Sequence, residues 1–333
     1  MRYLFALLAL PVASFAAACV TASPDCIEWV VLGGGPSRSM IYRSHPLDVR
    51  NEKITRATVV LHGASRDADN YFRTAVAAAF LAGALEDTVV IAPRIASRAG
   101  ATCRDMLAEN EISYPCDIWR SGGTAVESPK ITSFDFMDEI LRKVARKSVF
   151  PNLKSIVVAG HSAGGQYMNR YEMSNKVHDT LGVPIKYVVS NPSSYAYLDA
   201  VRPTGDPSDF GTDFRHFGEG RNCTTYDRWP YGLQNRSGGY TADIGDEQLR
   251  KQLAARPVVY LLGEIDILPL GGFDASCPAM AQGPTRRARG EAYYNYARLI
   301  LGAKHEKVVV SLCGHNARCM FTSDPALAIL FPK

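Results

Sequence analysis

Two kinds of hydrophobic pattern alternate along the chain. Short apolar runs rich in valine and isoleucine recur between longer segments whose apolar residues follow a helical spacing. The expected strands are 27–32, 39–43, 57–63, 87–93, 155–160, 185–191, 257–263 and 306–314, and the expected helices are about 69–84, 133–147, 163–177, 246–255, 285–301 and 316–330. From residue 57 onward the strands have the composition of parallel strands buried on both faces. The first two strands are instead expected to be antiparallel, at the point where the chain enters the sheet. The pattern predicts an α/β fold with a mostly parallel central sheet flanked by helices.

One long segment, residues 191–246, lacks this periodicity. It contains nine aromatic residues among prolines, glycines and aspartates. A loop of this length inside a domain is usually functional or disordered, and the aromatic content argues against disorder. We interpret it as a lid or pocket wall, with Tyr195, Trp229 and Tyr231 as candidates for the substrate pocket. The alternative is that these aromatic side chains build a small satellite core.

Size and charge narrow the class of protein. The chain has 333 residues, of which 47% are hydrophobic, and this is ample for one large α/β core. The net charge is +4, and the only dense basic run is Arg286, Arg287 and Arg289. We interpret this run as a solvated helix face, so a nucleic-acid partner is not expected. Without repeats or linkers in the sequence, residues 23–333 are predicted to form a single domain.

The N-terminus has the pattern of an export signal. One positive charge, Arg2, precedes a short apolar run and then small residues in an A-x-A arrangement. This predicts a signal peptide over residues 1–18, with a cut as late as residue 22, and a secreted or periplasmic protein. A lipid anchor on Cys19 is a third option, although the lipobox usually has leucine where Ala16 stands. No later segment has the length of a transmembrane helix, so no stable membrane insertion is expected.

The eight cysteines are better read as disulfides than as metal ligands in an exported protein. The suggested pairs are Cys103–Cys116, Cys313–Cys319 and Cys223–Cys277, with Cys26 either paired to Cys19 or free. Eight cysteines allow about a hundred pairings, so this connectivity is one hypothesis among many. A zinc site at Cys313, His315 and Cys319 would lack its remaining ligands, so no metal is expected.

A serine lies between glycines where an apolar strand passes into a helical pattern. The residues G-x-S-x-G occupy 160–164, and this order of strand, serine and helix is the nucleophile-elbow pattern. Glycines are needed because the backbones approach closely and the serine is held in a strained conformation. The turn would lift the hydroxyl of Ser162 above the sheet edge. A glycine-rich turn without chemistry is the alternative, which the flanking strand and helix disfavour.

A serine hydroxyl needs a general base to take its proton and a carboxylate to orient that base. His315 is the candidate base because, of the seven histidines, it alone both follows the candidate acid and lies at the exit of an expected strand. His305 precedes that strand and is expected to be an exposed surface residue. His62 and His161 are expected to pack against or orient neighbouring groups.

The candidate acid follows the expected strand 257–263. Asp266 is preferred to Glu264 because the strand should end near residue 263 and the orienting carboxylate lies a few residues into the loop. Glu264 stays open as the alternative, and Asp274 is a more distant one.

Two backbone amides are expected to form an oxyanion hole. One belongs to Ala163, directly after the serine. The other follows the expected strand 57–63, where the amide of Ala64, or less readily that of Ser65, would be the donor. Removing one such donor typically costs ~3 kcal/mol of transition-state stabilisation.

The stretches LHGASRDADNYF, GHSAGG, LLGEID and CGHNARCMF resemble the α/β-hydrolase superfamily, over essentially everything after the signal peptide. LHG followed by DADNYF is similar to the branch of secreted polyester depolymerases and feruloyl esterases. The resemblance implies a secreted serine esterase that forms an acyl-enzyme intermediate, uses no cofactor and acts on a small-molecule or polymeric ester. It carries over Ser162, Asp266 and His315 as the catalytic triad and Ala64 and Ala163 as oxyanion donors.

Two other functions stay open. A serine peptidase or amidase would use the same three residues, and a non-catalytic binding protein can share the fold. The presence of all three catalytic residue types disfavours the binding protein. A dinucleotide enzyme is suggested only by LGGGPSR at 32–38, which lacks G-x-G-x-x-G and the following helix and is therefore interpreted as a hairpin turn.

Overall fold

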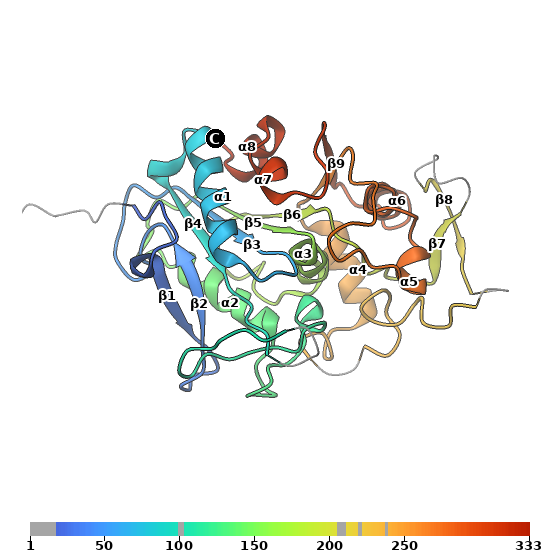
Figure 1. Cartoon of the computed structure of the whole chain (residues 1–333), viewed down its shortest axis with the longest axis horizontal. Coiled ribbons are helices and arrows are strands. Elements are labelled where there is room, and N and C mark those ends of the chain that lie inside the picture. The colour runs from blue at the N-terminus through green and yellow to red at the C-terminus, as the bar shows by residue number, and fades with distance from the viewer. Residues whose placement is uncertain (1–17, 99–102, 205–210, 219–221, 237–238) are drawn as a thin grey trace, which may run out of the picture.

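An eight-stranded sheet forms the centre of the protein (Figure 1). The computed structural model describes residues 18–98, 103–204, 211–218, 222–236 and 239–333, so the expected signal peptide lies almost wholly outside the described residues. The strand order is β1-β2-β4-β3-β5-β6-β9-β10. The bounds are β1 Ile27–Val31, β2 Arg38–Arg43, β3 Arg56–Leu61, β4 Thr88–Pro93, β5 Ser155–His161, β6 Ile185–Ser190, β9 Val258–Gly263 and β10 Glu306–Val310.

The pairing of these strands confirms a mostly parallel sheet with an antiparallel entry. β1 pairs with β2, and β2 with β4, in antiparallel register, and every later neighbour pair in this sheet is parallel. The turn from β1 to β2 is the hairpin expected at LGGGPSR, with Gly33 and Gly34 at positive φ. β10 is shorter than expected, because Leu312 adopts a left-handed conformation (φ 59°) and turns the chain out of the sheet.

Helices cover both faces of the sheet. Their bounds are α1 Ala68–Leu81, α2 Ser133–Val144, α3 Ala163–Ser174, α4 Asp246–Ala255, α5 Cys277–Met280, α6 Arg286–Leu299, α7 Ala317–Phe321 and α8 Asp324–Leu330, with single 3-10 turns at η1 Pro24–Cys26, η2 Leu85–Asp87 and η3 Trp119–Ser121. α1, α7 and α8 pack together on one face (Figure 1). α2, α3, α4 and α6 pack on the other.

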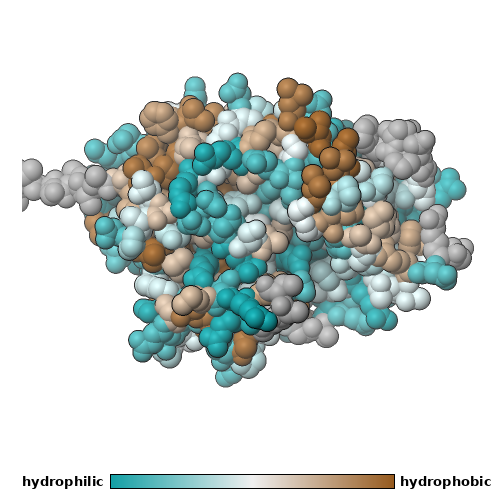
Figure 2. Space-filling view, viewed as in Figure 1, coloured by the Kyte–Doolittle hydropathy of each residue, from teal (hydrophilic) through white to brown (hydrophobic). Residues whose placement is uncertain are grey.

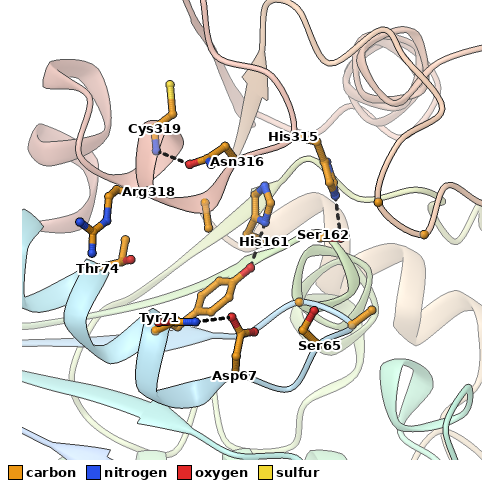
Figure 3. Close-up of a pocket in the computed structure, with 16 residues that line it drawn as sticks. Ser65, Asp67, Tyr71, Thr74, His161, Ser162, His315, Asn316, Arg318 and Cys319 are labelled. Carbon is orange, nitrogen blue, oxygen red and sulfur yellow. Dashed lines mark hydrogen bonds between the residues drawn. The ribbon is translucent and has the colours of Figure 1, made fainter. Parts of the chain in front are cut away.

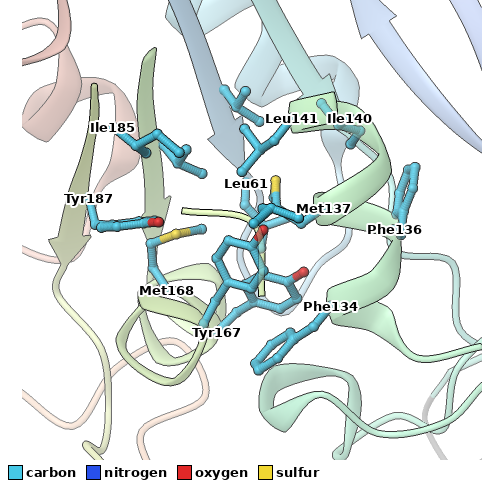
Figure 4. Packing of buried hydrophobic residues seen from close by; sticks show 14 of the residues in the cluster. Leu61, Phe134, Phe136, Met137, Ile140, Leu141, Tyr167, Met168, Ile185 and Tyr187 are labelled. Carbon is cyan, nitrogen blue, oxygen red and sulfur yellow. The ribbon is translucent and has the colours of Figure 1, made fainter. Parts of the chain in front are cut away.

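Alternation along each strand divides the core between the two faces. In β3, Val59 belongs to the cluster under α2 and α3, whereas Val60 belongs to the cluster under α1. Successive strand residues point to opposite faces, so a strand that is apolar throughout fills both layers. Figure 4 shows the first cluster, where α2 and α3 meet over the sheet with Phe134, Met137 and Tyr167 between them.

The helix expected over 316–330 is two helices. Asn316 caps the first by accepting a hydrogen bond from the amide of Cys319 (3.0 Å), and that helix ends at Phe321. The chain restarts at Asp324, with Pro325 in the first turn of α8. Proline has no amide hydrogen and is tolerated only at the start of a helix, so it separates the two segments.

The described part of the segment expected to form a lid has regular structure that its sequence pattern does not predict. It contains a small antiparallel sheet of β7 Val201–Thr204 and β8 Asp213–His216. Tyr195 and Tyr197 are fully buried against α6, where Tyr195 stacks on Tyr293 with ring centroids 4.5 Å apart. These two tyrosines extend the main core rather than forming a separate satellite core.

Four disulfide pairs close loops at the surface. They are Cys19–Cys26, Cys103–Cys116, Cys223–Cys277 and Cys313–Cys319, with Cα atoms 5.6 to 5.9 Å apart. Each of the suggested pairings is confirmed, with Cys26 joined to Cys19. None of the helices in the described part of the chain has the length and apolarity of a membrane span.

Candidate active site

The turn between β5 and α3 holds Ser162 in a strained conformation. Its φ of 59° and ψ of −119° lie outside the regions that residues other than glycine favour. The glycines around it are required by backbone contacts. A Cβ on Gly160 would overlap the carbonyl of Gly164, and a Cβ on Gly164 would lie 2.6 Å from the carbonyl oxygen of Leu61. This close approach of backbones is what the G-x-S-x-G pattern predicts.

Ser162, His315 and Asp266 come together at the carboxyl edge of the sheet. The Nε2 atom of His315 lies 2.9 Å from the Oγ of Ser162, and its Nδ1 lies 2.9 Å from the Oδ2 of Asp266 (Figure 3). A carboxylate only accepts hydrogen bonds, so Nδ1 carries the ring proton and Nε2 is left as an acceptor for the serine hydroxyl. Asp266 is buried, and the His315 side chain is 12% exposed. The histidine can therefore meet both a buried carboxylate and solvent.

Asn191, directly after β6, joins the loops that carry the acid and the histidine. Its side-chain oxygen accepts a hydrogen bond from the amide of Gly263 (2.8 Å), and its amide nitrogen donates to the carbonyl of Gly314 (3.2 Å). Asn191 has a φ of 46°, a left-handed conformation that asparagine tolerates better than most residues. The Cys313–Cys319 bridge closes the histidine loop from the other side. Asn191 was not among the predicted site residues, and its only signal in the sequence was its place at the end of an expected buried strand.

Arg286 lies behind the acid. Its Nη1 is 3.7 Å from the Oδ1 of Asp266, while Nε donates to the Oγ of Ser193 (2.7 Å) and Nη2 to the carbonyl of Gly271 (2.9 Å). Burial lowers the pKa of Arg286, and the charge of Asp266 opposes this shift. The interpretation of the basic run as a solvated helix face is thus wrong for Arg286 and Arg289, which are 1% and 0% exposed because α6 turns both toward the core.

The alternative acids lie elsewhere. Glu264 is exposed and accepts a hydrogen bond from the amide of Leu312 (2.8 Å). Asp274 accepts one from the hydroxyl of Tyr231 (2.8 Å). Of the three carboxylates, Asp266 is the one that contacts His315.

Three other histidines are buried and hydrogen-bonded. His161 contacts the hydroxyl of Tyr71 through Nδ1 (3.0 Å; Figure 3), and its ring centroid is 4.8 Å from that of His315. His305 was expected to be exposed, and this is wrong: it is 6% exposed, accepts from the hydroxyl of Tyr260 (3.0 Å) and donates to the carbonyl of Leu253. Burial lowers the pKa of His305 to about 4. The burial of His305 was not predictable from its position before β10, because its hydrogen-bond partners Tyr260 and Leu253 are distant in the sequence.

His62 anchors the loop after β3. Its Nε2 accepts a hydrogen bond from the amide of Ile95 (2.9 Å), so Nδ1 carries the proton and donates to the carbonyl of Gly63 (2.9 Å). Burial lowers the pKa of His62 to about 4, which keeps the ring neutral near pH 7. His62 therefore fixes this loop by hydrogen bonding without adding charge.

Arg66 fixes the same loop from the outside. Its Nη1 donates to the carbonyl of Ala64 (2.6 Å), and its Nε and Nη2 form a two-pronged ion pair with Asp105 at 2.7 and 3.0 Å. The amides of Ala64, Ser65 and Ala163 donate to no acceptor within the described part of the chain. The first amides of a helix lack intrahelical partners, so that of Ala163 can serve a ligand.

A cavity of about 1030 Å³ opens onto Ser162 and His315. Gly63, Ala64, Ser65 and Tyr71 form one wall, and residues 315–319 form the other (Figure 3). Hydrophobic side chains also gather near the loops that follow β9 and β10 (Figure 2), where Ile265, Ile267, Leu268, Leu270 and Leu312 are exposed. These residues do not line the cavity itself, but they lie on the same loops as its lining residues Gly271 and His315 and so form an apolar border beside it.

The three aromatic pocket candidates occupy different places. Tyr231 lines a second cavity of about 370 Å³, which meets the first at Gly272. Tyr195 is fully buried and lines neither of these cavities. Trp229 is half-buried and packs against the main core. Within the described residues, no three His, Cys, Asp or Glu side chains are grouped so that they could hold a metal ion.

Comparisons with known proteins agree with this fold. A family model described as "Alpha/beta hydrolase family" matches residues 58–329. No sequence match to a curated protein was found. Among solved structures, the chain is similar to poly(aspartic acid) hydrolase-1 from Sphingomonas sp. KT-1, with 20% identity, 91% of this chain and 97% of that chain covered, and a TM-score of 0.63. It is also similar to LpqC, a poly(3-hydroxybutyrate) depolymerase from Bordetella parapertussis, with 18% identity, 89% of each chain covered and a TM-score of 0.59. Since the family match spans most of the chain and the sheet is mostly parallel with helices on both faces, the protein belongs to the alpha/beta hydrolase family.

Proposed function

We propose that this protein is a serine hydrolase that cleaves carboxylic esters, with Ser162 as nucleophile, His315 as general base and Asp266 as the orienting acid. The observation that carries the proposal is the position of the His315 ring, whose two nitrogens lie 2.9 Å from the serine oxygen and 2.9 Å from the carboxylate. This is the contact pattern that nucleophile activation requires.

Acylation follows from the tautomer of His315. Nε2 takes the proton of Ser162 as Oγ attacks the acyl carbonyl, and the imidazolium that forms is stabilised by the carboxylate of Asp266. His315 then passes this proton to the oxygen of the leaving alcohol as the bond between acyl carbon and alcohol oxygen breaks. A water molecule, deprotonated by His315, attacks the acyl-enzyme and releases the acid while the proton returns to Ser162.

The negative charge on the acyl oxygen is stabilised by the oxyanion donors, which we assign to the amides of Ala64 and Ala163. Both amides lack an acceptor in the described part of the chain; Ala64 lines the cavity, and Ala163 directly follows the serine. Amides fixed in advance stabilise the transition state without reorganising during the reaction. His62 and Arg66 supply this fixation at Ala64.

We assign the segment 191–246 to the substrate site, as a lid over it or a wall of it, because Tyr231 of this segment lines the second cavity. Substrates are small-molecule or polymeric esters, and the apolar border beside the larger cavity favours an apolar chain. Two structures that share the fold are named for polymer hydrolysis, which places polymers among the substrates to test. The four disulfide pairs are consistent with export, as the N-terminal pattern predicts.

Labelling with a fluorophosphonate probe tests the proposal. Wild-type protein should be labelled, and the Ser162→Ala variant should not. Activity is then compared on p-nitrophenyl esters, feruloyl esters, polyester films and peptide amides. Faster cleavage of amides than esters would identify a peptidase instead, and a folded wild-type protein that takes no label would identify a binding protein.

A further inference from the structure

A second cavity extends from the serine site. Its volume is about 370 Å³, and it meets the larger cavity at Gly272. η3 and α3 contribute one side of it, and the segment around Tyr231 and the loop at Asp274 contribute the other. Gly272 lines both cavities, so the two lie next to each other at this residue.

One face of α3 connects the nucleophile to this cavity. Ser162, Gln166 and Arg170 follow one another at intervals of four residues, so their side chains lie along the same face of the helix. The rise of about 1.5 Å per residue puts the backbone of Arg170 about 12 Å beyond that of Ser162. Long helical side chains point back toward the N-terminus, and the Nη1 of Arg170 indeed donates to the carbonyl of Gln166 (2.7 Å). The guanidinium thus lies roughly 6–12 Å from the serine along the axis.

Arg170 is a buried cation that forms no ion pair with a described carboxylate. It is 1% exposed, and its acceptors are the carbonyls of Pro230 and Gln166 and the hydroxyl of Ser194. These acceptors use three of its five N–H groups. Burial lowers the pKa of Arg170 to about 10, so the side chain stays charged at neutral pH. Burying a charge without a counterion is unfavourable, which points to a ligand that supplies the missing charge.

Two further donors converge on the same cavity. Arg120 donates to the side-chain oxygen of Gln166 (3.1 Å) and pairs with Asp117 (2.5 Å), which leaves three of its N–H groups. The hydroxyl of Ser194 accepts from Gln166 (2.6 Å) and Arg170 (3.2 Å), so its own hydrogen is available to a ligand. Guanidinium and hydroxyl donors in this arrangement match the oxygens of a carboxylate.

Neither of the two carboxylates that line the cavity forms a hydrogen bond or ion pair with Arg170, although the charge of Asp274 partly opposes the lowering of the pKa of Arg170. The side chain of Asp117 is 85% exposed and faces Arg120. The carboxylate of Asp274 is held by the hydroxyl of Tyr231 (2.8 Å) and the amide of Ser276 (3.0 Å). Buried Arg289, which donates to the backbone carbonyl of Asp274 (2.9 Å), adds a second cation next to this loop.

We propose that this cavity is a specificity site for a carboxylate carried on the substrate, a few carbons from the ester that Ser162 cleaves, with Arg120, Arg170 and Ser194 as its ligands. The inference rests on the proposed esterase function and names its substrate class, namely esters that bear a free acid group. The apolar border beside the larger cavity then contacts the neutral part of the substrate.

The test compares matched ester pairs. Mono-p-nitrophenyl esters of straight-chain dicarboxylic acids are measured beside p-nitrophenyl esters of neutral acids of the same chain length. The expected result is a kcat/KM at least tenfold higher for the acidic member at the chain length that spans the two cavities. The Arg120→Gln and Arg170→Lys variants should lower this ratio at least tenfold. Arg50→Gln, which removes an exposed arginine paired with Glu52, should leave the ratio as in wild type.

Equal kcat/KM values for acidic and neutral esters at every chain length would overturn the proposal, as would an unchanged ratio in Arg120→Gln. A binding measurement separates this failure from that of the proposed function. Calorimetric titration of the Ser162→Ala variant with the monoethyl esters of the same dicarboxylic acids should show, for at least one chain length, binding that weakens at least tenfold when Arg120→Gln is added. If the wild-type protein cleaves no ester but this binding persists, the esterase proposal fails and the carboxylate site stands. If no binding is seen, the carboxylate site is refuted whatever the activity.

Discussion

The role of Asp266 can be tested by changing it to asparagine, because Arg286 determines how the new amide would orient. The amide of Asp266→Asn must place its oxygen toward either His315 or Arg286. The guanidinium of Arg286 lies 3.7 Å from Oδ1, and its Nη1 has no other hydrogen-bond acceptor in the described structure. It therefore favours the amide oxygen on its own side, which turns the NH2 group toward the Nδ1 atom of His315.

This orientation reverses the tautomer of His315. Nδ1 then accepts a hydrogen bond, the ring proton moves to Nε2, and Nε2 no longer accepts the proton of Ser162. Loss of the correct tautomer lowers kcat of serine hydrolases by ~10⁴, which corresponds to about 5.5 kcal/mol of barrier. We expect kcat to fall by about 10³ to 10⁴ with little change in KM, because the acid does not line the substrate cavity.

Ester hydrolysis under saturating substrate measures this effect, and thermal unfolding checks that the variant is folded. Removing one partner of a buried charge pair costs roughly 3 kcal/mol, so the Tm should fall by several degrees without loss of the native state at 25 °C. The matched control is Glu264→Gln, which alters the exposed neighbouring carboxylate. This control should keep kcat within about twofold of wild type.

The assignment of Asp266 as the orienting acid is wrong if Asp266→Asn retains more than a tenth of the wild-type kcat, or if Glu264→Gln loses most of the wild-type kcat. The first result would show that the buried carboxylate does not orient the base. The second would move the acid to the residue that the sequence left open.

Three further predictions address stability and loop position. Gly160→Ala should lower the free energy of unfolding by about 3 kcal/mol or prevent folding, since its Cβ would collide with a fixed helix carbonyl. Gly245→Ala, which has open space around it, should change the free energy of unfolding by about 0.5 kcal/mol. Urea unfolding of the two variants measures this difference. Between pH 6.5 and 4, His305 is protonated in the unfolded chain but not in the folded protein, because burial lowers its pKa from the ordinary 6.5 to about 4. The free energy of unfolding should therefore fall by up to about 1.4 kcal/mol per pH unit as the pH drops through this range. Unfolding curves over this range should be less steep in pH for His305→Gln, and identical slopes would contradict the assignment. Asp105→Asn should lower kcat about tenfold because Arg66 loses the ion pair that fixes the oxyanion loop, and an unchanged kcat in a folded variant would argue against that role.

The central sheet could be predicted from the sequence because its strands are buried on both faces. Runs such as 57–63 and 155–160 are rich in apolar residues whose burial requires helices on each side, so their composition predicts a sheet between two helical layers. Boundaries set by single residues were less predictable. The end of β10 depends on the left-handed Leu312, and the division of the last helix depends on Pro325, neither of which changes the apolar pattern.

The candidate site was predictable for residues whose chemical type and position after a strand both match a catalytic role. Ser162, Asp266 and His315 each follow a strand, and parallel strands bring their carboxyl ends to one edge of the sheet. The side chains around them depend on tertiary packing. The roles of Asn191 and Arg286 were not predicted, since each acts on loops that are distant in the sequence.

Burial was the property that the sequence predicted least well. Tyr195 was proposed to line the pocket and is covered by α6, while Arg286 was placed on a solvated face and is buried beside the acid. Both residues lie outside clear periodic segments or at the start of a helix, where the direction of a side chain is not determined by an amphipathic pattern. Hydrogen-bond partners for buried arginines become visible only in three dimensions.

The spacing of residues on α3 has a consequence for the evolution of this family. Because successive helical residues are rotated by about 100°, inserting or deleting one residue between Ser162 and Arg170 would carry the guanidinium away from the substrate path while leaving the elbow intact. Under the proposal of a carboxylate site, the nucleophile and the residue that selects the substrate lie on one helix, so a small change in the length of this helix would separate ester cleavage from the preference for acidic esters. Under the same proposal, an arginine eight positions after the elbow serine is the residue to look for when related chains are tested for this preference.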